Sequence, residues 1–185
     1  MPLIKDGKIV QDPWTEAAAG GPLPEVDALL VPYEVWKEER ETLMKRNGRF
    51  GVRLAADQPP QLIAGDLDRL DLVALEFPTF RDGRAYSYAR LLRERYGYKK
   101  ELRAVGNVLR DQFLFMHRCG IDAYAVADEK AAADWTRALK EISVVYQPAT
   151  DRRRSIPALR HRAPVGRNNR PSPSSSDDVV SSWAY

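Results

Sequence analysis

The hydrophobic positions of this chain form short apolar runs separated by longer amphipathic stretches. The runs are four to seven residues long, bounded by polar residues and glycine, and such runs are typical of buried β-strands. They predict strands at residues 28–31, 49–55, 72–77, 101–106, 122–127 and 143–147.

The stretches between the runs carry apolar residues at helical spacing. The clearest stripe consists of Ala85, Tyr88, Ala89, Leu92 and Tyr96, which lie on one side of a helix that ends at Gly97. The same spacing predicts helices over residues 33–46, 59–70, 85–96 and 108–120, and another after residue 128.

Two helix starts and one buried face are expected from side-chain chemistry. Asn107 is the expected N-cap of the helix over 108–120, and Asp128 is the expected N-cap of the last helix, because both can accept a hydrogen bond from a free backbone N–H. The buried side of the last helix is predicted to consist of Ala132, Trp135, Leu139 and Ile142.

Alternation of strands and helices with short connections predicts an α/β fold. Such connections favour a mostly parallel sheet, here of about five or six strands with alternating helices. Periodicity does not distinguish an open sheet from one that curls as part of a barrel. We expect the open sheet, since six strands are too few for the closed eight-stranded barrel.

The two ends of the chain have patterns of their own. Residues 3–10 predict a β-hairpin around Asp6-Gly7, a favoured two-residue turn, and the proline- and glycine-rich residues 12–25 predict a loop. Residues 1–150 are expected to form a single α/β domain. The basic, Pro/Ser-rich residues 151–185 predict a disordered tail.

The charge of the chain is concentrated in that tail. The net charge is +3, but residues 151–185 hold seven arginines and three aspartates, whereas the first 150 residues hold 22 basic and 23 acidic side chains. The domain itself is therefore almost neutral. Nucleic acid is a disfavoured partner, because no basic patch interleaved with aromatic residues accompanies the charge.

Composition also limits the class of protein. The sequence contains no run of 18 apolar residues and no basic start followed by an apolar stretch, so we expect neither a membrane-spanning segment nor a secretory signal, and we expect a cytoplasmic location. The single cysteine excludes an internal disulfide. With only two histidines in addition, a metal site is not expected.

Candidate chemistry gathers in the loops after two predicted strands. In parallel sheets, ligands bind beyond the carboxyl ends of the strands, where helix N-termini favour anions. Guanidinium groups add paired donors that suit an oxyanion. The loops predict an anion-binding or docking site built from Arg81, Gly83, Arg84, Tyr86, Ser87, Asn107, Arg110 and Gln112, with Asp82 and Asp111 as candidate acids or bases.

A purely structural interpretation of the same loops stays open. In it, Asp82 caps the helix, while Arg81 and Arg84 are solvated or pair with Glu76 and Asp111. Cys119 and His117 are likewise interpreted as packing residues. No glycine-rich dinucleotide fingerprint, phosphate loop or nucleophile elbow is found, so no cofactor is evident, although an unrecognised flavin or nicotinamide site is left open.

Residues 75–124 resemble a known bacterial family. The segment LEFPTFRDGRAYSYARLLRERYGYKKELRAVGNVLRDQFLFMHRCGIDAY is similar to the central signature of domain of unknown function 934 (DUF934). Weaker similarity extends from the N-terminal hairpin to residues 144–148.

The resemblance implies a role in assimilatory sulfate and sulfite reduction. Members of the family are described as oxidoreductases or accessory proteins of sulfite reduction, which implies sulfite reductase or phosphoadenylyl-sulfate reductase as a partner. Because electron transfer needs a cofactor, the redox centre is expected to belong to that partner or to be an unrecognised flavin. An enzyme acting on a small anionic substrate, such as a phosphate or sulfur oxyanion, is the alternative.

Overall fold

One curled sheet organises the described part of the chain. The computed structural model describes residues 2–18, 20–127, 131–142, 144–151, 153 and 155–160. Within these residues the strands are β1 (Leu3–Lys5), β2 (Lys8–Val10), β3 (Thr15–Glu16), β4 (Ala28–Pro32), β5 (Arg49–Leu54), β6 (Leu72–Phe77), β7 (Glu101–Gly106) and β8 (Ala123–Ala125). They form an eight-stranded sheet in the order β2-β1-β8-β7-β6-β5-β4-β3.

The sheet is mostly parallel, as the alternation predicted. Neighbouring strands from β3 to β8 are parallel, and β1 and β2 form an antiparallel hairpin that joins the sheet beside β8. Asp6 and Gly7 form the predicted hairpin turn, both with positive φ (52° and 75°). The predicted α/β class and N-terminal hairpin are confirmed.

Five of the six predicted strands are confirmed as β4 to β8. The predicted strand at 143–147 is wrong: residue 143 lies outside the described residues, and Val145 makes only an isolated parallel bridge to Ser155. The sixth parallel strand is instead β3, within residues predicted to form a loop. At two residues, β3 is too short to produce a readable alternation.

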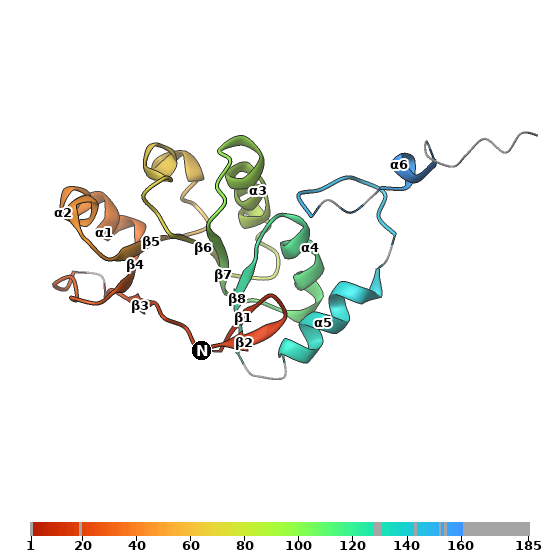
Figure 1. The fold of residues 1–185 in the computed structure, drawn as a ribbon, viewed down its shortest axis with the longest axis horizontal. Helices are drawn as coiled ribbons and strands as arrows, with labels where there is room; N and C mark the ends of the chain where they lie inside the picture. Colours follow the sequence, from red (N-terminus) through yellow and green to blue (C-terminus); the bar gives the residue numbers. More distant parts are fainter. Residues whose placement is uncertain are drawn as a thin grey trace, which may run out of the picture.

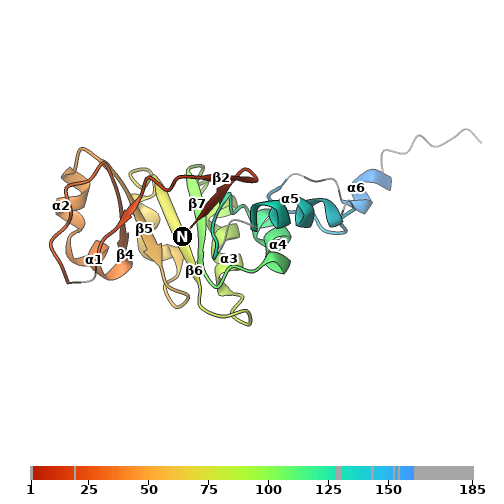
Figure 2. The ribbon, with the colours of Figure 1, turned by 90° about the horizontal axis from the view of Figure 1, so that it is seen from below.

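The helices that connect β4 to β8 lie along one face of the sheet (Figure 1). In chain order they are α1 (Tyr33–Glu38), α2 (Arg40–Lys45), the 3₁₀-helix η1 (Pro60–Asp66), α3 (Arg84–Arg90), the π-helix η2 (Leu91–Arg95), the 3₁₀-helix η3 (Arg110–Gln112), α4 (Phe113–Arg118), α5 (Ala131–Glu141) and α6 (Ile156–Arg160). None of these described helices combines the length and apolar character needed to cross a membrane. Figure 2 shows α4, α5 and α6 extending beyond one side of the sheet.

Several predicted helix boundaries need correction. The helix predicted over 33–46 is interrupted at Glu39, and the one predicted from residue 108 begins at Arg110. Asn107 is therefore not its N-cap, and the Asn107 N–H instead donates to the Phe77 carbonyl over 2.7 Å. Ile142 follows the end of α5 and is 45% exposed, so it does not belong to the buried side of that helix.

Other predictions near the C-terminus are tested only in part. Trp135 is buried, as predicted, and Leu139 packs against the core. Asp128 and the side chain of Ala132 lie outside the described residues, as do residues 161–185 of the predicted tail. The described residues before 161 include α6 and the carboxylate of Asp151, whose side chain is 1% exposed and pairs with Arg118.

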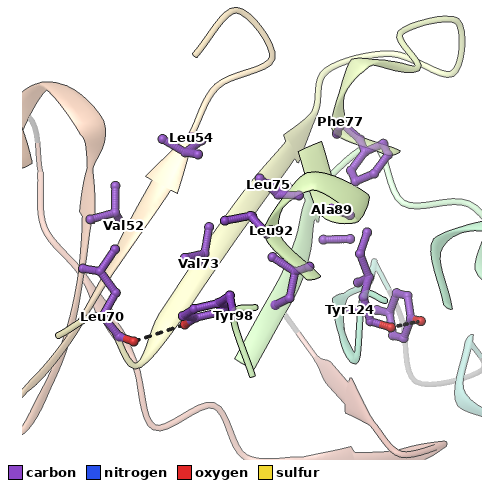
Figure 3. Packing of buried hydrophobic residues seen from close by; sticks show 14 of the residues in the cluster. Val52, Leu54, Leu70, Val73, Leu75, Phe77, Ala89, Leu92, Tyr98 and Tyr124 are labelled. Carbon is purple, nitrogen blue, oxygen red and sulfur yellow. Dashed lines mark hydrogen bonds between the residues drawn. The ribbon is translucent and has the colours of Figure 1, made fainter. Parts of the chain in front are cut away.

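The main core fills the space between the sheet and the helices. From the sheet, Val73 and Leu75 of β6 meet Ala89 and Leu92, which belong to the predicted stripe after β6 (Figure 3). Tyr98 is buried there and donates from its hydroxyl to the Leu70 carbonyl. These contacts fix α3 and η2 against the strand that carries the candidate loop.

The curl of the sheet corrects our expectation of an open sheet. Strand β2 ends at Val10 and β3 begins at Thr15, yet these strands form opposite edges. A flat eight-stranded sheet is about 34 Å wide at the usual strand spacing, whereas the five peptide steps between these residues span at most about 17 Å. The connection is possible only because the sheet curls, and Figure 1 shows the N-terminal chain passing along the side opposite the helices.

Candidate functional site

The loop after β6 places its charged residues next to each other at the start of α3. Asp82 accepts the Arg84 backbone N–H over 3.2 Å, and its carboxylate receives the Arg84 guanidinium, with an Nη2–Oδ2 distance of 2.7 Å. The hydrogen bonds from Arg84 lower the pKa of Asp82. The N-cap of α3 is Gly83 and no side chain caps the helix, so the predicted N-cap role of Asp82 is wrong. Asp82 instead precedes the N-cap and binds both the backbone N–H and the guanidinium of Arg84.

The remaining residues of this loop face outward. Arg81 and Ser87 are exposed. Gly83 has a φ of −93°, so the sharp backbone turn does not depend on a positive φ at this glycine. The guanidinium of Arg84 is occupied by a carboxylate of its own loop.

The loop after β7 has a similar internal pairing. Arg110 contacts the Asp111 carboxylate over 3.4 Å and also pairs with Glu141 of α5. Asn107 is exposed, whereas Gln112 is buried and its Oε1 accepts the Leu109 N–H over 3.3 Å. Arg84 and Arg110 each pair with a carboxylate of this chain, and an oxyanion would have to compete with that carboxylate. The anion-binding site predicted from these arginines therefore stays a prediction.

Three predicted residues come together in a pocket between α3 and α4. Tyr86, Asp111 and Gln112 line this space of about 470 Å³, which we call the α3–α4 pocket. Its full lining is Phe80, Tyr86, Arg90, Asp111, Gln112, Phe115, Arg118, Cys119, Gln147, Pro148 and Ala149.

Helical spacing on two neighbouring helices explains why these side chains meet. Tyr86 and Arg90 are four residues apart on α3, while Phe115, Arg118 and Cys119 are three and four residues apart at α4. The two helices follow β6 and β7, which pair side by side. Tyr86 is held by an edge-on contact with Phe77, whose ring centroid lies 5.1 Å away.

Arg118 holds in place residues 147–149, which line the pocket in addition to residues of α3 and α4. Its Nη2 donates to the Gln147 carbonyl over 2.6 Å, and its Nε donates to Asp151 over 3.3 Å. The Thr150 hydroxyl and backbone N–H both donate to the Arg118 carbonyl. These bonds hold residues 147–149 against α4, directly after the segment 143–147 for which the sequence predicted a strand.

The two lining side chains that could act as nucleophiles, Tyr86 and Cys119, are both protonated. Burial raises the pKa of the Cys119 thiol, and the nearby Arg90 and Arg118 guanidinium groups offset this only in part. Burial also raises the pKa of Tyr86 to about 12. Both side chains therefore keep their protons at neutral pH.

The aromatic rim is the feature that sequence reasoning missed. Phe80 and Phe115 are 60% and 57% exposed and frame the pocket, next to the guanidinium group of Arg118. The spacing of Phe115, Arg118 and Cys119 on one helical side was a usable signal.

The described residues contain no group of three or more histidine, cysteine, aspartate or glutamate side chains placed to hold a metal ion. The exposed rings of Phe80 and Phe115 offer an apolar surface to a planar ligand, but the geometry does not test the flavin or nicotinamide alternative, which stays a prediction.

Comparison with known proteins bears on the family of the chain. A search of curated proteins finds no match. Residues 51–156, more than half of the chain, match the family model described as bacterial protein of unknown function (DUF934). This segment contains most of β5, all of β6 to β8, α3, α4 and the whole lining of the α3–α4 pocket. The chain therefore belongs to the DUF934 family.

Proposed function

We propose that this chain is a cytoplasmic accessory protein of assimilatory sulfate and sulfite reduction that acts with sulfite reductase and binds through the α3–α4 pocket. The pathway and the partner rest on the resemblance of residues 75–124 to the family signature. The pocket supplies the means of binding.

One observation carries the binding role: exposed phenylalanine rings and guanidinium groups share one pocket. Phe80 and Phe115 leave more than half of their surface in water, and exposed aromatic residues beside arginine are characteristic of the centres of protein interfaces. Such a pocket suits a partner segment that places an apolar side chain beside a carboxylate.

Arg90 is the guanidinium best placed to receive that carboxylate, or alternatively a sulfur oxyanion. It pairs with Glu94 over 3.1 Å, and both side chains are about half exposed. Such exposed pairs add little stability and exchange readily. Arg118 is instead engaged with Gln147 and Asp151, so its role is to hold the pocket wall.

The chemistry of the pocket favours docking over catalysis. Tyr86 and Cys119 are protonated at neutral pH, so neither supplies a nucleophile. The alternative enzyme on a small anionic substrate relies on Asp111, whose carboxylate is 79% exposed on the rim and pairs with Arg110. In the docking account the redox centre belongs to the partner.

Affinity purification from cells grown on sulfate tests the proposal. Tagged wild-type protein is expected to capture sulfite reductase, and the double variant Phe80→Ser with Phe115→Ser is expected to lose it. Leu62→Ser is the matched control, because Leu62 is 45% exposed but lies on η1 outside the pocket. Equal capture by the double variant, or no capture of sulfite reductase at all, would contradict docking through the pocket.

Two further measurements separate the pathway from the ligand. Deletion of the gene is expected to cause a requirement for cysteine on sulfate medium, and normal growth there would contradict the proposed role. Calorimetric titration with sodium sulfite tests the oxyanion: binding that is lost in Arg90→Ala would favour an oxyanion ligand over a docked carboxylate.

A further inference from the structure

A second cavity lies on the opposite face of the sheet from the helices. It encloses about 370 Å³ between the concave side of the sheet and residues 11–16, which we call the strap. Gly106 and Ala125, the last residues of β7 and β8, form part of its lining. The cavity therefore reaches the carboxyl ends of parallel strands, where ligands of such sheets bind.

A row of cationic side chains crosses the concave face. The strand register aligns Arg53 of β5 with Ala74, Ala74 with Arg103 of β7, Arg103 with Ala123, and Ala123 with Lys5 of β1. Small alanines thus alternate with three cations along a line across the sheet. The two arginines line the cavity, and the alanine between them leaves space above the sheet.

Both arginines are bound by carboxylates from two directions. The side chain of Arg103 is 3% exposed and donates to both oxygens of Asp12 over 2.7 and 3.1 Å, and also to Glu101 from its own strand. Arg53 pairs with Glu76 of the sheet over 3.1 Å and with Glu16 of the strap. In each case the sheet provides one carboxylate and the strap provides the other.

The charge balance of the cavity depends on the strap. With the strap in place, the cations Lys5, Arg53 and Arg103 meet four carboxylates. Without Asp12 and Glu16, the same three cations would meet only Glu76 and Glu101. Each arginine would lose one of its two carboxylates, and this loss is costly for the buried Arg103, so a ligand that displaces the strap has to offer an acidic group to each arginine.

The attachment of the strap is limited. Within the described residues, 11–14 make no backbone–backbone hydrogen bond to the sheet, and β3 adds only a two-residue ladder to β4. The side chains of Asp12 and Glu16 are 32% and 47% exposed, and Trp14 packs against a small concave cluster of Leu30, Leu72 and Ala74. Segments with few backbone hydrogen bonds open at low free-energy cost.

We propose that this cavity binds a small dicarboxylate, and that Asp12 and Glu16 of the strap occupy its two arginine sites in the unliganded protein. Arg103 binds Asp12 through two parallel hydrogen bonds, which is the bidentate geometry in which a guanidinium group binds a carboxylate. A dicarboxylate replaces the two strap charges one for one and leaves the charge balance unchanged. This inference is independent of the proposed function, which concerns the other face of the sheet.

Calorimetric titration of the full chain with malonate, succinate and glutarate tests the proposal, with acetate as the single-charge control. The variant Asp12→Asn with Glu16→Gln keeps the shape of the strap but removes its charges. Without these charges the strap binds the two arginines more weakly, so the state in which the strap is displaced becomes more populated. The apparent Kd falls as this binding-competent state gains population, so the best dicarboxylate is expected to bind the variant about tenfold more tightly or better. Asp27→Asn is the matched control, since Asp27 pairs with Arg49 in an exposed position outside the cavity.

Three results would overturn the inference: a folded double variant that binds no dicarboxylate, equal affinity for acetate, or undiminished binding after Arg53→Gln is added to the double variant. Hydrogen exchange of the wild-type protein gives an answer that does not depend on the variants folding. Excess of the best-binding dicarboxylate is expected to speed amide exchange in residues 11–16, and unchanged exchange at all three dicarboxylates would show that the strap only closes the sheet.

Discussion

Arg93 of η2 and Asp122, which precedes β8, form an ion pair with an Nη2–Oδ2 distance of 2.7 Å. The same guanidinium donates to the carbonyls of Gly120, Tyr98 and Lys100 over 2.7 to 2.8 Å. Asp122 in turn accepts the Leu102 N–H of β7. Arg93 thus joins η2 to the residues that precede β7 and to the residues that precede β8.

Arg93→Ala is expected to destabilise the fold by about 2–3 kcal/mol, because it leaves carbonyls and a carboxylate without their donor. Arg90→Ala is the control: its ion pair with Glu94 is exposed, so its loss is expected to cost less than about 0.5 kcal/mol. Urea unfolding followed by circular dichroism measures both. A loss in Arg93→Ala no larger than in Arg90→Ala would show that the network does not stabilise the fold.

Gly106, the last residue of β7, and Gly83, the N-cap of α3, are expected to respond differently to the same substitution. Gly106 has a φ of +89°, and a Cβ there would lie 2.7 Å from the Phe77 carbonyl oxygen, so Gly106→Ser is expected to cost about 2 kcal/mol or more. Gly83 has an ordinary negative φ, and its nearest neighbour would be 3.9 Å away.

Gly83→Ser is therefore expected to leave the melting temperature unchanged or slightly raised, since serine is a favourable residue at a helix N-cap. Thermal unfolding of the two variants under the same conditions provides the comparison. A large loss of stability in Gly83→Ser would mean that the loop before α3 needs a conformation that only glycine adopts.

The regular part of the fold could be predicted from sequence because its signals are local. Strands β4 to β8 are apolar runs, and the stripe of Ala85, Ala89 and Leu92 identified the helix that packs on β6. The curl could not be predicted, because it follows from the pairing of β3 with β4, and two residues carry no periodic signal.

The candidate site shows the same division between local and distant information. Residues within one loop, such as Asp82 and Arg84, pair as local chemistry allows. The partner of Arg110 is Glu141 and the partner of Arg103 is Asp12, both far away in sequence. Whether an arginine is free for a ligand depends on such distant carboxylates, so arginine content alone could not locate the site.

His117 is expected to make stability depend on pH. Burial and the nearby Arg153 lower its pKa, and its ring packs edge-on against Trp135 at a centroid distance of 6.0 Å. The unfolded chain therefore binds a proton on this histidine at higher pH than the folded chain does. Its contribution is fully present above the unfolded pKa of about 6.5 and is lost as the pH falls toward the folded pKa.

Melting temperatures measured between about pH 5 and 7 are expected to fall less steeply with decreasing pH in His117→Gln than in the wild type. The chain has one other histidine, His161, and His161→Gln is the matched control. An identical pH slope in His117→Gln and the wild type would show that His117 is as easily protonated in the fold as in the unfolded chain.

The single cysteine allows the α3–α4 pocket to be probed directly. Because burial raises the pKa of the Cys119 thiol, the thiolate fraction at pH 8 is smaller than in a free cysteine, and alkylation by iodoacetamide is expected to be slower than in the unfolded protein. Chain unfolded in guanidinium chloride provides the reference rate.

Phe115→Ser opens the rim beside the thiol and is expected to raise the rate, whereas Leu62→Ser on η1 is expected to leave it unchanged. A folded wild-type protein that reacts as fast as the unfolded chain would mean that the pocket leaves its thiol open to water, which is incompatible with the apolar docking site proposed for it.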